Sequence, residues 1–168
     1  MNKIERKYLA HFINAAESEQ EDAVYERLGT DLEELSPQMN ARVETRRNIL
    51  GENAVLISGY DKTARVDPYY AVVGSALFER LQSIIDEGKV LDALKTDVVE
   101  VKLWNVENDP DFDPSKQSYF PAVRQTVYLE VVSYGGNADG YQIPFIIHYT
   151  GQKTVGRFHV GNRHFEED

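Results

Sequence analysis

The chain has 168 residues, which is the size of one domain and enough to bury a substantial core. Hydrophobic residues make up 42% and charged residues 27%, a balance that excludes wholesale disorder, and the absence of cysteine excludes disulfides, thiolate nucleophiles and cysteine-ligated metals. With 18 basic and 28 acidic residues the net charge is −10, which argues against a protein that grips nucleic acid, because duplex binding depends on Lys and Arg.

The N-terminal part of the chain predicts short strands joined by turns. Residues 8–15 and 24–28 are short strand candidates, and residues 29–34 predict a single turn with Thr30 and Glu33 at capping-box spacing. The start of the chain is charged, and no apolar run approaches the length of a membrane span. We therefore expect a chain that folds in the cytoplasm and has no membrane partner.

Residues 36–66 predict a long hairpin that projects from the domain. The first arm carries Val43, Arg46 and Arg47 with few core apolar residues, Gly51 turns the chain, and a strand covers residues 54–66. The faces of this hairpin are expected to be polar, so one subunit cannot bury it well. We expect it to lie on another chain.

One amphipathic helix is predicted at about residues 75–87, flanking a sheet. It follows the stop at Asp67-Pro68 and the pair Tyr69 and Tyr70, with Ser75 as a candidate N-cap and Gly88 as a candidate C-terminal stop. The apolar residues at helical spacing are Leu77, Phe78, Leu81, Ile84 and Ile85.

The C-terminal half predicts strands with period-two alternation. The strand candidates are residues 99–103, 123–131, 141–149 and 154–160. Turns are expected at the glycine-rich residues 135–140 and at residues 150–152, and residues 162–168 are expected to fray. Six to eight strands and one helix predict a mainly β fold, a β-sandwich or partial barrel with one flanking α-helix, in a single domain spanning residues 1–168.

The sequence contains no pattern that indicates a metal site. Asp109, Asp111 and Asp113 match the opening of a calcium loop, but Pro114 and Phe120 stand where such a loop needs glycine and glutamate, so we expect a solvated acidic loop. His148 and His159 are expected on adjacent strands of a hairpin, where they are interpreted as an ordinary pair of imidazoles. No nucleophile elbow, zinc helix or dinucleotide fingerprint appears, so we expect no enzyme, no catalytic residue, no cofactor and no metal.

Several motifs together resemble one family. These are residues 27–36 (RLGTDLEELS), 43–52 (VETRRNILGE), 59–60 (GY), 66–70 (VDPYY) and 77–82 (LFERLQ). The chain resembles the major tail (tail tube) protein of long-tailed bacteriophages of Gram-positive hosts, most strongly over its first half. Relatives tend to carry a Gly-Asp-Pro-like turn before the helix, and this chain has Gly74-Ser75-Ala76 there.

The resemblance implies a phage tail-tube-like fold and a structural virion protein. Such subunits form hexameric rings that stack into a tube for DNA ejection, so the implied partners are the chain itself, the tape measure protein and the tail terminator or tip proteins. Genomic DNA would pass through the lumen without specific binding, past an acidic wall that repels phosphate. Assembly would take place in the host cytoplasm, with the virion as the final location.

Five residues are the candidates for subunit contacts: Val43, Arg46, Arg47, Tyr69 and Tyr70. Arg46 and Arg47 are expected to bridge to carboxylates of a neighbouring subunit. A related alternative is the inner tube subunit of a contractile tail or tailocin. An alternative of another class is a ligand-binding β-barrel, whose cavity would be lined by the aromatic residues Trp104, Tyr141, Phe145 and Tyr149.

Overall fold

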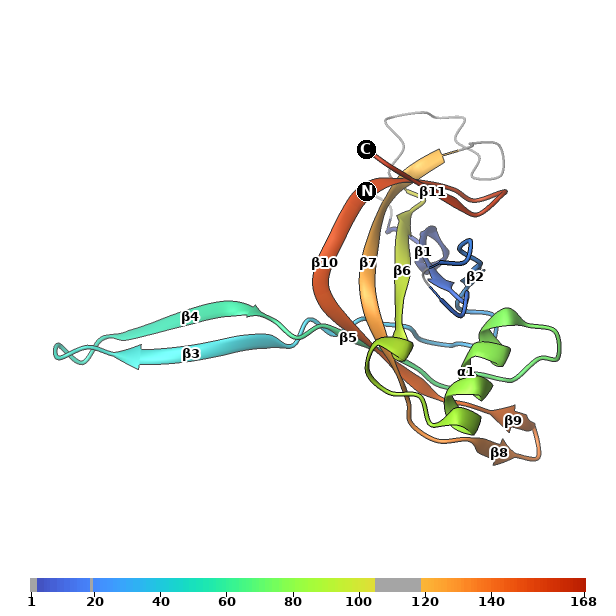
Figure 1. The fold of residues 1–168 in the computed structure, drawn as a ribbon. Helices are drawn as coiled ribbons and strands as arrows, with labels where there is room; N and C mark the ends of the chain where they lie inside the picture. Colours follow the sequence, from blue (N-terminus) through green and yellow to red (C-terminus); the bar gives the residue numbers. More distant parts are fainter. Residues whose placement is uncertain (1–2, 19, 105–118) are drawn as a thin grey trace.

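The computed structural model describes residues 3–18, 20–104 and 119–168 (Figure 1). It is mainly β, with a curled sheet that forms a partial barrel, one α-helix against it and a two-stranded ribbon that projects from the rest of the molecule. The predicted fold class is therefore confirmed. The calcium-like run at residues 109–113 lies outside the described residues.

The helical elements are η1 (Arg6–Tyr8), α1 (Ala76–Glu87) and η2 (Leu91–Leu94). The strands are β1 (Leu9–Asn14), β2 (Tyr25–Arg27), β3 (Ala41–Arg47), β4 (Asn53–Tyr60), β5 (Thr63–Val66), β6 (Lys95–Lys102), β7 (Tyr119–Val131), β8 (Gly135–Asn137), β9 (Gly140–Gln142), β10 (Phe145–His159) and β11 (His164–Glu167).

The main sheet is antiparallel throughout and has seven strands. Its order is β11-β10-β7-β6-β1-β2. β5 pairs with residues 145–148 of β10, on the edge of β10 opposite to β7. β8 and β9 form a separate small hairpin, so most of residues 135–140, which were expected to form a turn, are in strands, and the strand expected at 141–149 is interrupted after Gln142. The two long strands, β7 and β10, hold the rest of the sheet together.

The sheet buries opposite faces at its two ends. Near α1, Val127 and Leu129 of β7 belong to a core shared with the helix, whereas Phe120 and Ala122 belong to a second core inside the curl. Adjacent strand residues point to opposite faces, so the even and odd positions of one strand serve different cores. The Phe12 and Phe158 rings lie 4.6 Å apart although two strands separate them in the sheet, which shows how far the sheet curls.

Helix α1 begins and ends where the sequence predicted. The Ser75 hydroxyl accepts a hydrogen bond from the Phe78 backbone N–H (3.3 Å), and Gly88 adopts a left-handed conformation with φ of 60°. Arg80 is buried and donates to three backbone carbonyls, those of Ala16, Ala93 (3.3 Å) and Lys95 (2.8 Å). The helix is thus tied to the segments on both sides of it.

Three further predictions about strands are wrong. The expected turn at residues 150–152 is absent, because β10 continues through a bulge between Tyr149 and Lys153. The expected strand at 54–66 is two strands, since β4 ends at Tyr60 and β5 begins at Thr63. The described residues contain eleven strands in place of six to eight.

The C-terminal tail is ordered as a strand, so the prediction that it frays is also wrong. β11 pairs with the end of β10, and Phe165 packs into the core inside the curl. A Cβ atom on Gly156 would lie 2.7 Å from the Phe165 ring and 2.3 Å from the Glu166 carbonyl oxygen. The glycine therefore permits the close approach of β11.

Candidate functional site

The candidate functional site of this fold is the ribbon of β3 and β4, residues 41–60, which we call the arm. Every residue of β3 is exposed, and in β4 only Gly59 is half-buried. Within the part of the chain that the structure describes, these two strands pair only with each other, and Figure 1 shows them extending away from the sheet. The arm contributes no side chain to either core.

The arm is fixed at its base. Gln38 and Thr63 exchange two backbone hydrogen bonds (2.6 and 3.0 Å), and the Asp61 N–H donates to the Asn40 carbonyl (3.1 Å). The side-chain amide of Asn40 also donates to the Asp61 carbonyl and to the Thr63 hydroxyl (3.0 and 3.1 Å). The arm therefore leaves the body at a defined point, where β5 enters the main sheet.

One face of the arm is apolar, which corrects the expectation that its faces are polar. In the register of the ribbon, Val43 lies opposite Ile57 and Thr45 lies opposite Val55, so these four side chains share a face. Val43, Val55 and Ile57 are 59%, 65% and 56% exposed. The opposite face carries Glu44, Arg46, Ala54 and Leu56. Three large aliphatic side chains on one exposed ribbon face form a surface that a partner would bury.

The tip of the arm, residues 48–52, is a self-contained turn. The Asn48 side-chain oxygen accepts from the backbone N–H groups of Leu50 and Glu52 (2.9 and 3.0 Å), and its amide donates to the Glu52 carboxylate (3.2 Å). Gly51 supplies the left-handed conformation with φ of 80°. This turn points Ile49 and Leu50 into solvent, where they are 103% and 75% exposed.

Three of the five predicted interface residues lie on the arm. Val43 is on its apolar face, and Arg46 pairs with Glu44 of the same strand at 3.0 Å while remaining largely exposed. Arg47 stands at the end of β3, next to the tip. The predicted bridges from Arg46 and Arg47 to another subunit stay a prediction.

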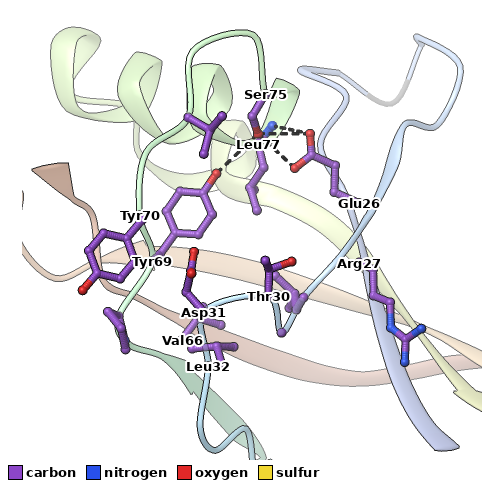
Figure 2. Close-up of a pocket in the computed structure, with 14 residues that line it drawn as sticks. Glu26, Arg27, Thr30, Asp31, Leu32, Val66, Tyr69, Tyr70, Ser75 and Leu77 are labelled. Atoms are coloured by element: carbon purple, nitrogen blue, oxygen red, sulfur yellow. Dashed lines mark hydrogen bonds between the residues drawn. The ribbon is translucent and has the colours of Figure 1, made fainter. Parts of the chain in front are cut away.

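The other two predicted residues, Tyr69 and Tyr70, line an open cleft of about 290 Å³ on the body, between α1, the end of β5 and the loop after β2. Figure 2 shows this cleft. The Tyr69 hydroxyl lies 3.4 Å from Ser75 Oγ, and burial raises the pKa of this phenol. The structure does not bring the tyrosines together with the three arm residues in one subunit.

A carboxylate fixes the helical wall of the cleft. Glu26 of β2 accepts hydrogen bonds from the Ser75 hydroxyl (3.0 and 3.1 Å) and from the Leu77 backbone N–H (3.3 Å). A negative charge at the start of α1 is favourable because the free N–H groups make this end of a helix positive. Glu26 thus links β2 to the start of the helix at the wall of the cleft.

A second carboxylate in the cleft has no such role. The Asp31 side chain points toward the cleft beside Tyr69 in Figure 2, above Leu32 and Val66. Among the described residues it has no hydrogen-bond or ion-pair partner, and it is exposed. The cleft therefore combines an apolar floor with one unpaired negative charge.

The histidine interpretation needs correction. His148 and His159 lie on the same strand, β10, and not on adjacent strands of a hairpin. His148 Nε2 is 2.6 Å from the Glu130 carboxylate, and His159 Nδ1 accepts from the Asn162 N–H (3.0 Å). The described part of the chain contains no group of three or more residues that could hold a metal ion.

The aromatic residues proposed for a ligand-binding barrel lie in different environments. Phe145 is fully buried in the core beside α1, and the Tyr141 hydroxyl donates to Gln82 on the helix surface (2.8 Å). Trp104 is 37% exposed. Five clefts formed by described residues are lined by other side chains, and none of these five includes Trp104, Tyr141, Phe145 or Tyr149.

No protein-family model matches the chain, and no curated protein has a sequence that matches it significantly. None of the described helices is both long and apolar enough to cross a lipid bilayer.

Proposed function

We propose that this chain is a structural subunit that assembles with copies of itself into stacked rings, and that the resulting tube is the tail tube of a long-tailed bacteriophage. The observation that carries the proposal is the arm. Twenty residues, numbers 41–60, form a regular ribbon that buries nothing in its own subunit. An isolated two-stranded ribbon is marginally stable in water, so a partner surface is what would justify it.

An open sheet edge supports the same proposal. β5 covers residues 145–148 of β10 and β11 covers residues 156–159, and between them residues 150–154 have no strand partner on that side within the described chain. Unpaired strand edges are templates for pairing with another chain. Contacts that join different surfaces of identical subunits close into rings when the rotation permits.

The charge distribution fits a conduit. The arm carries three arginines and two glutamates, a net charge of +1, which leaves 15 basic and 26 acidic residues and a net charge of −11 for the rest of the chain. A lumen lined by an acidic body would repel phosphates and let DNA slide. In this proposal the arm makes the assembly contacts, and the acidic remainder of the chain lines the path of the DNA.

Electron microscopy of the concentrated protein is the direct test. We expect rings or tubes, formed by the chain alone or after addition of tail initiator components. A protein that stays monomeric under all of these conditions would overturn the proposal.

Removal of the arm provides the matched variant. Ala41 and Tyr60 lie directly opposite each other at its base, so replacing residues 42–59 with Asn-Gly closes a two-residue hairpin. We expect the shortened chain to keep its β-rich circular dichroism spectrum and its thermal transition, because the arm is outside both cores. Rings and tubes should be absent. Normal assembly of the shortened chain would show that the arm is not the contact.

A further inference from the structure

The geometry points to the place where the tip of the arm binds: we infer that Ile49 and Leu50 of one copy insert into the cleft at Tyr69 of a second copy, where Arg47 pairs with Asp31. This inference rests on the proposed self-assembly and adds to it the receiving surface. It joins the tip of the arm and the cleft at Tyr69, which do not contact each other within one subunit.

The tip presents two exposed aliphatic side chains on a hydrogen-bonded turn. Ile49 and Leu50 are the outermost side chains of the turn, and Ile49 is as exposed as a residue can be. Their backbone is already held by the hydrogen bonds of Asn48, so little conformational freedom remains to be lost on binding. A partner that buries these two aliphatic side chains has to offer an apolar recess.

The cleft offers such a recess. Its floor contains Leu32, Val66 and Leu77, and Val72 on its rim is 59% exposed. Its helical wall is held in place by the contacts of Glu26 with Ser75 and Leu77, so the cleft exists before a partner arrives. An open, preformed apolar recess is the usual form of a recognition site.

The charges are complementary. Arg47 precedes the tip by one residue, and the arm as a whole is slightly basic in an otherwise acidic chain. Asp31 is the one lining carboxylate of the described cleft that has no partner among the described residues. Arginine and a carboxylate that meet at the edge of an apolar contact fix its register and orientation more than its strength.

The occupant has to come from another copy. β4 spans eight residues, roughly 25 Å at the rise of an extended strand, and Figure 1 shows the arm pointing away from α1. The cleft lies beside α1, and Val66 is only three residues beyond the start of β5, near the arm's base. The extended arm therefore carries its tip away from its own cleft, and repetition of the contact joins copies in sequence.

Cysteine cross-linking tests this placement cleanly, because the natural chain has no cysteine. Protein with Leu50→Cys is mixed with protein with Val72→Cys, and the assembled sample is oxidised. We expect a covalent dimer on a non-reducing gel. The matched control replaces Val72→Cys with Val155→Cys, a residue that is 56% exposed on β10 outside the cleft, and should give at most a trace of dimer.

Each other outcome has a defined meaning. Rings or tubes in the microscope without a Leu50→Cys and Val72→Cys dimer would overturn the docking site and leave the proposed assembly standing. Dimers of Leu50→Cys alone, or dimers with Val155→Cys that form equally well, would also overturn it. The absence of any assembled particle would instead count against the proposed function.

A charge exchange provides a second readout. Arg47→Glu should raise the protein concentration needed for assembly at least tenfold, through repulsion from Asp31. Adding Asp31→Arg to that variant restores the opposite pair and should recover most of the loss. Failure of the second substitution to restore assembly would contradict the pairing.

Discussion

The apolar face of the arm gives the sharpest quantitative prediction. We consider the triple variant Val43→Thr, Val55→Thr and Ile57→Thr. Threonine keeps the β-branch, so the ribbon retains its preference for extended structure. All three side chains are more than half exposed in the single subunit and pack against neither core. The substitutions therefore remove apolar surface with little effect on the folded monomer.

The magnitude follows from the exposed fractions. Full burial of a valine or isoleucine side chain is worth about 1.5–3 kcal/mol, and 59%, 65% and 56% of these three side chains remains to be buried in a contact. Each side chain then contributes about 1–2 kcal/mol to an interface, or about 3–5 kcal/mol for the three. At 1.4 kcal/mol per tenfold change, the affinity of one contact should fall roughly a hundred- to thousandfold.

The assay measures assembly and stability on the same samples. Light scattering against concentration gives the threshold for assembly, and circular dichroism gives the melting temperature of the monomer. We expect a threshold at least a hundredfold higher and a free energy of unfolding changed by no more than about 0.5 kcal/mol per site. Val90→Thr, at a 66% exposed site outside the arm, is the control. An unchanged concentration threshold for assembly would refute the assignment of this face to a contact. A large loss of monomer stability would show that this face is buried within the single subunit.

Three further predictions concern the body. Ser75→Ala should lower the free energy of unfolding by about 1 kcal/mol and the melting temperature by about 2–4 °C, because the N-cap bond to Phe78 and the bond to Glu26 are lost. Arg80→Leu should cost roughly 3 kcal/mol in urea denaturation by removing three hydrogen bonds from a buried guanidinium to backbone carbonyls, and Arg80→Lys should recover part of it. The hydrogen bond from His11 lowers the pKa of Glu100, so its ionised form stabilises the fold above the ordinary glutamate pKa of about 4.3, and this contribution is lost as pH falls through the lowered value. Glu100→Gln should therefore be less stable than the natural chain at neutral pH, and in urea titrations the two should converge as the pH falls below the lowered pKa of Glu100.

The helix could be predicted from the sequence because its signals are local. Ser75, Gly88 and the apolar stripe that includes Leu81 act within a few residues, and the structure places each where the spacing indicated. β1 and β2 match the short strand candidates at residues 8–15 and 24–28, and β7 includes the strand predicted from alternation at residues 123–131. The predictions failed where the deciding partner is distant along the chain.

β10 illustrates that failure. Gly151 and its neighbours have the composition of a turn, but β7 supplies partners on both sides of the bulge and keeps the strand continuous. The tail is held in the same way, since Phe165 finds its site beside Gly156 only after β10 is in place. Neither pairing produces a pattern among the few neighbouring residues from which a strand is predicted.

The arm was foreseen as a projection, but its apolar face was not. The sequence predicts a single strand over residues 54–66 within a hairpin whose faces are polar, so Val55 and Ile57 are not expected to form an exposed apolar face. The structure ends β4 before β5 begins and leaves Val55 and Ile57 in solvent. The cleft at Asp31 was missed because it joins three segments that are distant in sequence.

The arm also carries the features that keep an exposed ribbon from associating at random. Its second face bears charges of both signs, Arg42, Glu44 and Arg46, and the register shifts at a bulge between Arg42 and Val43. Charged side chains and bulges interfere with edge-to-edge pairing of strands, whereas a face with three large aliphatic side chains still permits an oriented contact. Arg42 lies over Gly59, where any Cβ atom would come within 2.1 Å of its guanidinium, so the bulged end of the ribbon is covered by a charge. A ribbon with these properties favours a specific partner over aggregation, which is what the proposed self-assembly requires.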